Sequence, residues 1–353
     1  MEAFKDIFED CTSLGTKIPK DNYLSEGKYI VVDQGQNIIA GYTNEEDGLY
    51  EDVPAIVFGD HTRIIKYVDE PFFLGADGVK LLKSKKKDAN YKYLYYALKN
   101  ARIPDTGYNR HFKWLKEVNI EYPEPDKQQK IVEVLDKISS VIEERKLELQ
   151  QIDELIKARF VELFGDMADP RCKWDKCKLI DACTDSNDIK CGPFGTQLGK
   201  DEYTDSGIEV WEIPQINSEF KTMPTHFVTK EKAQNLEQYS IRPGDIAMSR
   251  KGNVGRCAVF PESFEEGIIH SDVLRIRVDG SRIAPEFMMR QLHYSGDIQH
   301  QIELVSSGAI MAGINVTKLK DIFVYVPPKT LQDEFVSFVK QVDKSKVVEL
   351  TAT

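Results

Sequence analysis

Four short polar loops in this sequence carry side chains of the kinds that bind nucleic acid. The candidate binding residues are His61, Thr62, Arg63 and Lys66 in "FGDHTRIIK", Asn109, Arg110, His111 and Lys113 in "YNRHFK", Thr196, Gln197 and Lys200 in "CGPFGTQLGK", and Arg250, Lys251, Asn253 and Arg256 in "MSRKGNVGR". Arginine, lysine, asparagine and glutamine hydrogen-bond base edges and phosphates, and neighbouring glycines let the backbone approach a duplex closely. Each loop taken alone is also typical of a solvated turn.

Motifs for catalysis are absent from the sequence. It contains no G-x-G-x-x-G, no G-x-x-x-x-G-K-[ST], no H-E-x-x-H, and no Asn-Pro-Pro-aromatic or Asp-Pro-Pro-aromatic tetrad. His61 or His111 could act as a general base, but ordinary hydrogen bonding accounts for both. Asp60 and Asp77, at successive predicted strand ends, could hold a metal ion in a nuclease or transferase. No nucleophile or base accompanies them, so we expect neither catalysis nor a metal site.

Composition and charge restrict the partners. The chain has 353 residues and a net charge of −11, so DNA binding requires positive charges sorted onto local faces. Four of the six cysteines lie close together, but their spacing does not give the pairs of a zinc site. They are Cys172, Cys177, Cys183 and Cys191. Without a long apolar run or a signal-peptide layout, we expect a cytoplasmic protein that spans no membrane.

The same junction occurs twice in the chain. "VNIEYPEPDKQQKIVEVL" at Val118–Leu135 and "IFVYVPPKTLQDEFVSFV" at Ile322–Val339 both pass from a strand pattern, through prolines and a glutamine, into a helix pattern. A shift of 204 residues places Gln128 on Gln332. The repeat suggests that one domain has been duplicated.

A second internal similarity lies upstream, where Cys11–Thr12 matches Cys183–Thr184 at a shift of 172 residues. Because this shift is 32 residues smaller, the second copy should contain roughly thirty extra internal residues. Each copy reads as short β-branched or aromatic strands followed by a helix. We therefore predict an α+β fold with two similar domains at 1–123 and 167–327, each a twisted, mostly antiparallel β-sheet with helices.

Long helices should follow both domains, at 124–166 and 328–353. The first carries a heptad seam, which indicates a coiled coil. Its apolar members are Ile131, Leu135, Ile138, Ile142, Leu149, Ile152, Ile156 and Leu163, and the second helix offers Phe335, Val339 and Val342. We predict an antiparallel coiled coil in a pseudo-twofold arrangement. Because the second helix is short, we expect the seam around Leu149 to Leu163 to lack an intrachain mate and to allow self-association.

Taken in order, these motifs resemble the specificity subunit of type I restriction-modification systems over essentially the whole chain. The matching stretches include "FGDHTRIIKYVDEPFFLGADGVKLL", "YNRHFKWL", "PEPDKQQKIVEVLDKI", "GPFGTQL", "YSIRPGDIAMSRKGNVG" and "VPPKTLQDEFVSFV". The resemblance implies two target-recognition domains, a central helical spacer and a short C-terminal helical region. Each domain would read one half of a bipartite site in double-stranded DNA.

The resemblance further implies a chain without catalysis of its own. Its helices would bind two methyltransferase subunits, and restriction/translocase subunits would join for cleavage. S-adenosylmethionine, ATP and Mg²⁺ would then belong to those partners, and none to this chain. The alternative is a stand-alone two-domain DNA-binding or orphan scaffold protein with no methyltransferase partner.

Overall fold

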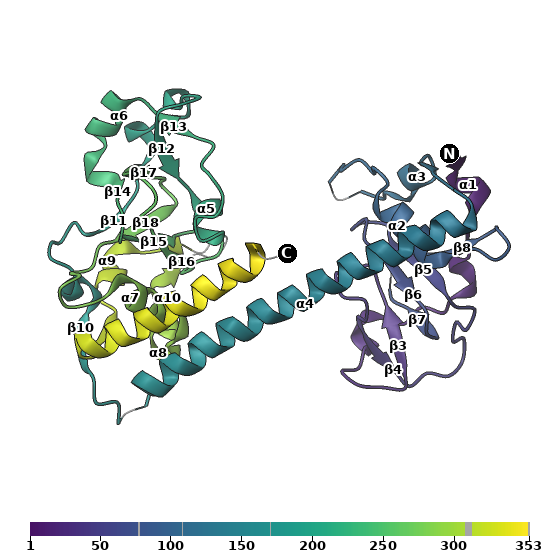
Figure 1. Cartoon of the computed structure of the whole chain (residues 1–353), viewed down its shortest axis with the longest axis horizontal. Coiled ribbons are helices and arrows are strands. Elements are labelled where there is room, and N and C mark those ends of the chain that lie inside the picture. The colour runs from purple at the N-terminus through teal and green to yellow at the C-terminus, as the bar shows by residue number, and fades with distance from the viewer. Residues whose placement is uncertain (77, 108, 170, 308–312, 352–353) are drawn as a thin grey trace. The chain divides into compact units, whose positions relative to one another are not determined.

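The computed structural model describes residues 1–76, 78–107, 109–169, 171–307 and 313–351. They divide into two compact units, Met1–Lys146 and Leu147–Thr353, and the boundary falls inside the long helix α4 (Pro125–Phe164; Figure 1). Within the described residues, no helix is both long enough and apolar enough to cross a membrane.

The first unit is built on two small sheets. One is four-stranded in the order β2 (Phe8–Asp10), β8 (Val79–Ser84), β5 (Ala55–Gly59) and β6 (Ile65–Val68), and the other is β4 (Gly41–Thr43), β3 (Tyr29–Val32) and β7 (Phe72–Leu74). All pairs are antiparallel except β3–β7. Helices are α1 (Phe4–Ile7), α2 (Tyr91–Lys99) and α3 (Phe112–Leu115). Helix α2 buries Tyr93, Leu94 and Leu98, the helical spacing that places an apolar face on the core.

The second unit repeats this plan. One four-stranded sheet has the order β11 (Ile189–Cys191), β18 (Val273–Ile276), β15 (Ile246–Ser249) and β16 (Cys257–Val259). The other has the order β13 (Phe227–Val228), β12 (Ile208–Trp211), β17 (Gly267–Ile269) and β14 (Ser240–Ile241). Again one pair, β12–β17, is parallel. Strand β19 (Ser306–Ser307) pairs antiparallel with β20 (Gly313–Ile314). Helices are α5 (Ile213–Asn217), α6 (Lys230–Asn235), α7 (Pro285–Tyr294), α8 (Gly296–Val305), α9 (Val316–Lys320) and α10 (Lys329–Thr351).

The repeated junction forms the same contacts in both units. Strand β1 (Glu2–Ala3) pairs with β9 (Asn119–Ile120), as β10 (Asp175–Lys178) pairs with β21 (Phe323–Val326). In the first unit the Gln128 side-chain amide donates a 2.7 Å hydrogen bond to the Pro123 carbonyl, and Gln332 donates an identical 2.7 Å bond to Pro327. Each glutamine is buried and ties the start of its helix to the preceding strand. The structure thus supports the duplication.

The structure gives a different register for the upstream similarity between Cys11–Thr12 and Cys183–Thr184. The Phe4 amide donates to the Val118 carbonyl (3.0 Å), and the Leu179 amide donates to Ile322 (2.8 Å). These equivalent bonds relate the copies by 175 residues at this end and by 204 at the other. The second copy is therefore 29 residues longer inside, which agrees with the roughly thirty expected. Both segments form a single helical turn whose first and fourth residues are buried, Phe4 and Ile7 in one and Leu179 and Ala182 in the other. A slip of three residues keeps the same face inward, so the sequences match out of register.

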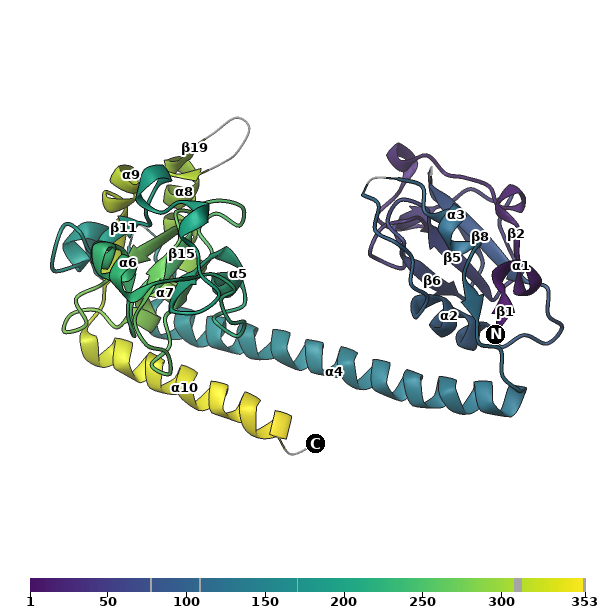
Figure 2. The same ribbon diagram turned by 90° about the horizontal axis from the view of Figure 1, so that it is seen from above.

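Helix α4 ends at Phe164 because Gly165 adopts a left-handed backbone conformation with a φ of 75°. Its last turns lie in the second unit, where α10 runs beside them in the opposite direction (Figures 1 and 2). Ile156, Phe160 and Phe164 are buried there with Phe335, Val336 and Val339 of α10. A 2.6 Å ion pair between Arg159 and Glu334 flanks this contact.

This packing corrects the expectation for the seam. Ile152, Ile156 and Leu163, expected to lack a mate, belong to the core that α10 completes. The exposed part of the seam lies earlier along the helix, where Ile138 and Ile142 are each 49% exposed and Leu149 is 48% exposed. The reason is chain direction: α10 starts beside the end of α4 because both are attached to the second unit, so it covers the end of α4.

Candidate nucleic-acid interface

In the first unit, the β5–β6 hairpin turn and the segment before α3 come together. The Asp60 carboxylate, which is buried, accepts a 2.7 Å hydrogen bond from the Phe112 amide and so caps α3. Its own amide donates to the Gly78 carbonyl at 2.7 Å. Arg63 takes a left-handed conformation in the turn (φ 62°), and its guanidinium pairs with Asp105 at 2.7 Å. The turn is thus held from several sides.

Two predicted binding residues of this unit are buried. His111 is 1% exposed, and its amide donates to the Asp60 carbonyl at 2.8 Å. Lys66 is 3% exposed, with its ammonium 3.5 Å from the Asp33 carboxylate, and burial lowers the pKa of Lys66. His111 thus supports the turn and Lys66 is held against the segment after β3, so both side chains have structural partners.

The other predicted residues of the first unit are accessible. Thr62, Asn109, Arg110 and Lys113 are exposed, and His61 and Arg63 are partly exposed. The Lys113 ammonium lies 4.9 Å from the centre of the half-exposed Trp114 ring. The surface at this edge is therefore basic and aromatic.

The structure gives Asp60 a capping role and offers no support for a metal ion there. Its partner in that hypothesis, Asp77, lies outside the described residues. Among the residues that are described, no group of three histidine, cysteine, aspartate or glutamate side chains is arranged to hold a metal. Burial raises the pKa of Cys183 to about 12 and that of Cys191 to about 11, so both side chains stay as thiols.

In the second unit, the two predicted loops also meet. The Arg250 guanidinium lies 5.0 Å from the centre of the exposed Phe194 ring, and its Nε donates to the Ile314 carbonyl at 3.3 Å. Lys251 pairs with Asp272 at 2.8 Å. A platform made of Phe194, Arg250 and Lys251 therefore faces outward beside the β15–β16 hairpin.

The remaining predicted residues of this unit differ in their roles. The Gln197 side-chain oxygen accepts hydrogen bonds from the Phe194 amide (3.1 Å) and the Tyr239 hydroxyl (2.9 Å), so it shapes the turn. Arg256 pairs with Glu219 at 3.0 Å. Thr196, Lys200 and Asn253 are exposed.

A carboxylate that follows a strand of the parallel pair in each unit was missed by sequence reasoning. Glu212 directly follows β12, and its carboxylate lies 2.8 Å from His226 Nδ1 and 3.9 Å from His270 Nε2. Asp33 occupies the equivalent position after β3 in the first unit. The sequence did contain a signal, because "IVVD" and "EVWE" each end a buried run with an acidic residue.

Comparison with known proteins accounts for this arrangement of two alike units. Residues 3–154 and 188–352 match the family described as "Type I restriction modification DNA specificity domain". The chain belongs to this family. The match covers both units, so the predicted relationship to type I specificity subunits is confirmed.

Individual relatives agree with the family assignment. Over 132 residues the chain is 31% identical to the type I restriction enzyme EcoR124I/EcoR124II specificity subunit of Escherichia coli, a match covering 34% of this chain and 33% of that relative. It therefore spans about a third of that protein. The crystal structure of the S subunit of a type I restriction-modification system from M. genitalium aligns over 99% of this chain and 91% of its own, with a TM-score of 0.58 and 18% identity. The predicted two-domain α+β fold is confirmed.

Proposed function

We propose that this chain is the DNA-recognition subunit of a type I restriction-modification complex, in which each unit reads one half of a bipartite site. The main support is the repetition itself: two units of the same topology each present basic side chains at the same sheet-edge hairpin, β5–β6 and β15–β16. A split, asymmetric DNA target needs two readers of one design with different side chains. The absence of catalytic motifs from the sequence agrees with a non-catalytic subunit.

The side chains proposed to meet DNA are the accessible ones around these hairpins. In the first unit they are Thr62, Arg63, Asn109, Arg110 and Lys113, and in the second Thr196, Lys200, Arg250, Lys251, Asn253 and Arg256. Arginine can bind guanine with two hydrogen bonds, and lysine contributes mainly by neutralising phosphate. His111, Lys66 and Gln197 would act indirectly, by holding the loops in shape.

The helices supply the spacer and the docking surface in this proposal. With 40 residues, α4 is roughly 60 Å long, enough to set the distance between half-sites that lie about one ~34 Å DNA turn apart. The exposed seam at Ile138 and Ile142 would take part in binding two methyltransferase subunits, with restriction/translocase subunits joining them. S-adenosylmethionine, ATP and Mg²⁺ would be bound by those partners.

The mass of the assembled complex tests this proposal. The chain is mixed with the methyltransferase subunit encoded with it, with and without duplex DNA, and the mass is measured by light scattering. We expect one chain with two methyltransferase copies. A chain that stays alone while still binding duplex would favour the stand-alone DNA-binding protein. A homodimer that is lost when Ile138 and Ile142 become charged would favour self-association through the seam.

A further inference from the structure

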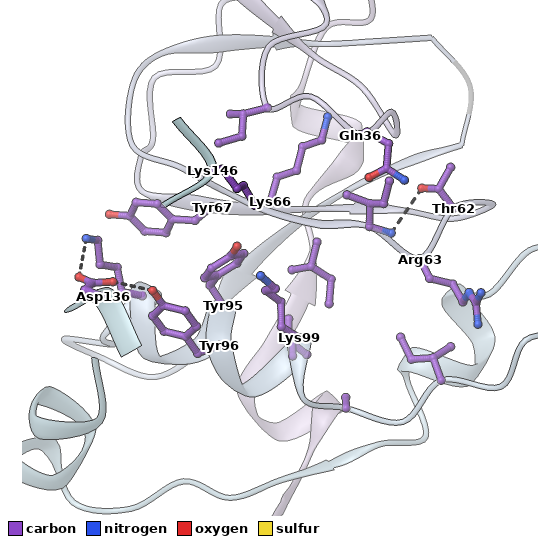
Figure 3. A pocket seen from close by; sticks show the side chains of 17 residues that line it. Gln36, Thr62, Arg63, Lys66, Tyr67, Tyr95, Tyr96, Lys99, Asp136 and Lys146 are labelled. Carbon is purple, nitrogen blue, oxygen red and sulfur yellow. Dashed lines mark hydrogen bonds and ion pairs between the residues drawn. The ribbon is translucent and has the colours of Figure 1, made fainter. Parts of the chain in front are cut away.

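A groove of about 840 Å³ opens in the first unit beside the edge strand β6 and helix α2 (Figure 3). Its cationic lining residues are Arg63, Lys66, Lys92, Lys99 and Lys146, and its acidic lining residue is Asp136. Asp105 and Asp33, which are not lining residues, pair with Arg63 and Lys66. Five cations against these three anions leave an excess of two positive charges, in a chain whose net charge is −11. Positive charge is thus concentrated locally, as binding of a polyanion requires.

The second unit serves as an internal comparison. It has a groove of about 1250 Å³ at the equivalent place, beside the β15–β16 hairpin and helix α7. Its charged lining residues are Lys157, Lys221, Arg256 and Arg290, against Asp153, Glu154, Glu219 and Asp343. These four cations and four anions cancel. The shared topology therefore produces a groove in both units, and the positive charge is specific to the first.

Tyrosine rings form a row along the basic groove. The ring centres of Tyr67 and Tyr95 are 6.3 Å apart, and those of Tyr95 and Tyr96 are 5.1 Å apart. The Lys92 ammonium lies 5.9 Å from the Tyr67 ring centre, and the Lys99 ammonium 5.2 Å from that of Tyr95. Aromatic faces alternating with cations are the arrangement that binds single-stranded nucleic acid, by stacking on bases and neutralising phosphates.

The cations of this groove differ in their availability. Lys66 is buried against Asp33, and Lys92 is held by Asp136 at 2.8 Å. Lys99 is exposed and lies over a ring. Lys146 forms an ion pair with Glu143, one turn earlier on α4, and both side chains are exposed. Such surface ion pairs contribute little to the free energy of folding. Lys99 and Lys146 can therefore turn toward a phosphate at low cost.

We propose that this groove binds a single nucleic-acid strand, with its phosphates at Lys99 and Lys146 and its unpaired bases against Tyr67 and Tyr95. The inference rests on the proposed function, because the strand would come from DNA held by the recognition loops. Tyrosine faces favour a strand over an acidic peptide, which would use the lysines but leave the rings without a stacking partner. They also favour unpaired bases, because the faces of paired bases are covered within the duplex stack.

Fluorescence anisotropy of a labelled oligothymidylate, with the full chain, tests the inference. Tyr95→Leu keeps apolar volume but removes the flat ring, and should weaken binding by roughly fivefold or more. Lys99→Gln should lower the slope of log K against log salt by about 0.7. Lys157→Gln, in the neutral groove of the second unit, is the matched control and should bind like the wild type. Thermal unfolding checks that all three variants are folded.

Several results would overturn the inference. Equal weakening by Lys99→Gln and Lys157→Gln would mean diffuse electrostatic attraction, and an unchanged affinity in Tyr95→Leu with strong competition by polyglutamate would indicate an acidic peptide. If the wild type binds duplex but no oligothymidylate, the inference fails and the proposed function stands. If the chain binds neither and forms no complex with the methyltransferase, both fail.

Discussion

Replacement of Phe335 by alanine should release α10 from α4 and destabilise the second unit. The Phe335 side chain is 0% exposed, and its ring centre lies 5.5 Å from that of Phe160 and 5.7 Å from that of Phe164, both edge-to-face. Truncating a buried phenylalanine to alanine costs about 3–5 kcal/mol, through lost burial and the cavity that remains. Because α10 carries this ring near its start, the helix loses its main anchor.

The expected thermal shift follows from the size of the unit. For a folded unit of about 200 residues, 1 kcal/mol lowers Tm by roughly 2–4 °C, so Phe335→Ala should lower the Tm of the second unit by roughly 6–20 °C. Scanning calorimetry measures this, and urea unfolding gives the free energy directly. The first unit should unfold at an unchanged temperature.

Phe323→Ala is the matched control. Its side chain is 47% exposed on β21, so truncation should change the free energy of unfolding by no more than about 0.5 kcal/mol. If the two variants unfold alike, α10 is not packed on α4 as described. The spacer would then consist of α4 alone, and the assignment of Phe335 to the seam would be wrong.

Three further predictions concern binding and pH. Arg250→Ala should weaken binding to the cognate duplex by about 1–3 kcal/mol in a gel-shift titration, whereas Arg171→Ala, in the exposed segment between α4 and β10, should not. Hydrogen bonding to Lys92 lowers the pKa of Asp136, so the ionised carboxylate stabilises the fold above the pKa that it has in the unfolded chain. This stabilisation should be lost as the pH falls through the lowered pKa. In an acid titration of unfolding free energy, Asp136→Asn should not show this loss. Burial lowers the pKa of His293 to about 4, so the unfolded chain takes up this proton first. Stability should fall by roughly 3 kcal/mol between pH 6.5 and 4, and His293→Gln should remove most of that fall in urea titrations.

The elements that depend on local pattern could be predicted from the sequence. The repeated Pro–Gln junction was visible because Gln128 and Gln332 bond to carbonyls only five residues away. The long helix was visible because its apolar residues recur at heptad spacing. Such features need only neighbours along the chain, and they account for the two-domain plan and for the start of each helix.

What could not be predicted depends on distant partners. His111 reads as a loop residue beside Arg110, yet it is buried because Asp60, 51 residues away, accepts its hydrogen bonds. Lys66 is likewise held by Asp33 from another sheet. Which part of the α4 seam is covered also depends on where α10 starts in space. A single sequence shows that these residue types are present, but their positions along the chain do not indicate which of them are in contact.

Under the proposed function, one fold must read two different half-sites, and the two hairpins differ in a way that would allow this. The Asp60 amide donates to the Gly78 carbonyl at 2.7 Å, and the Arg250 amide donates to the Asp272 carbonyl at 2.8 Å, at equivalent positions of the two units. Each hairpin is therefore held in part by a backbone bond that involves no side chain. At that position the first unit has a buried carboxylate and the second an arginine stacked on an exposed ring. Because these two bonds do not involve side chains, the residues proposed to face DNA could differ between the units, as a subunit that reads two separate half-sites would require.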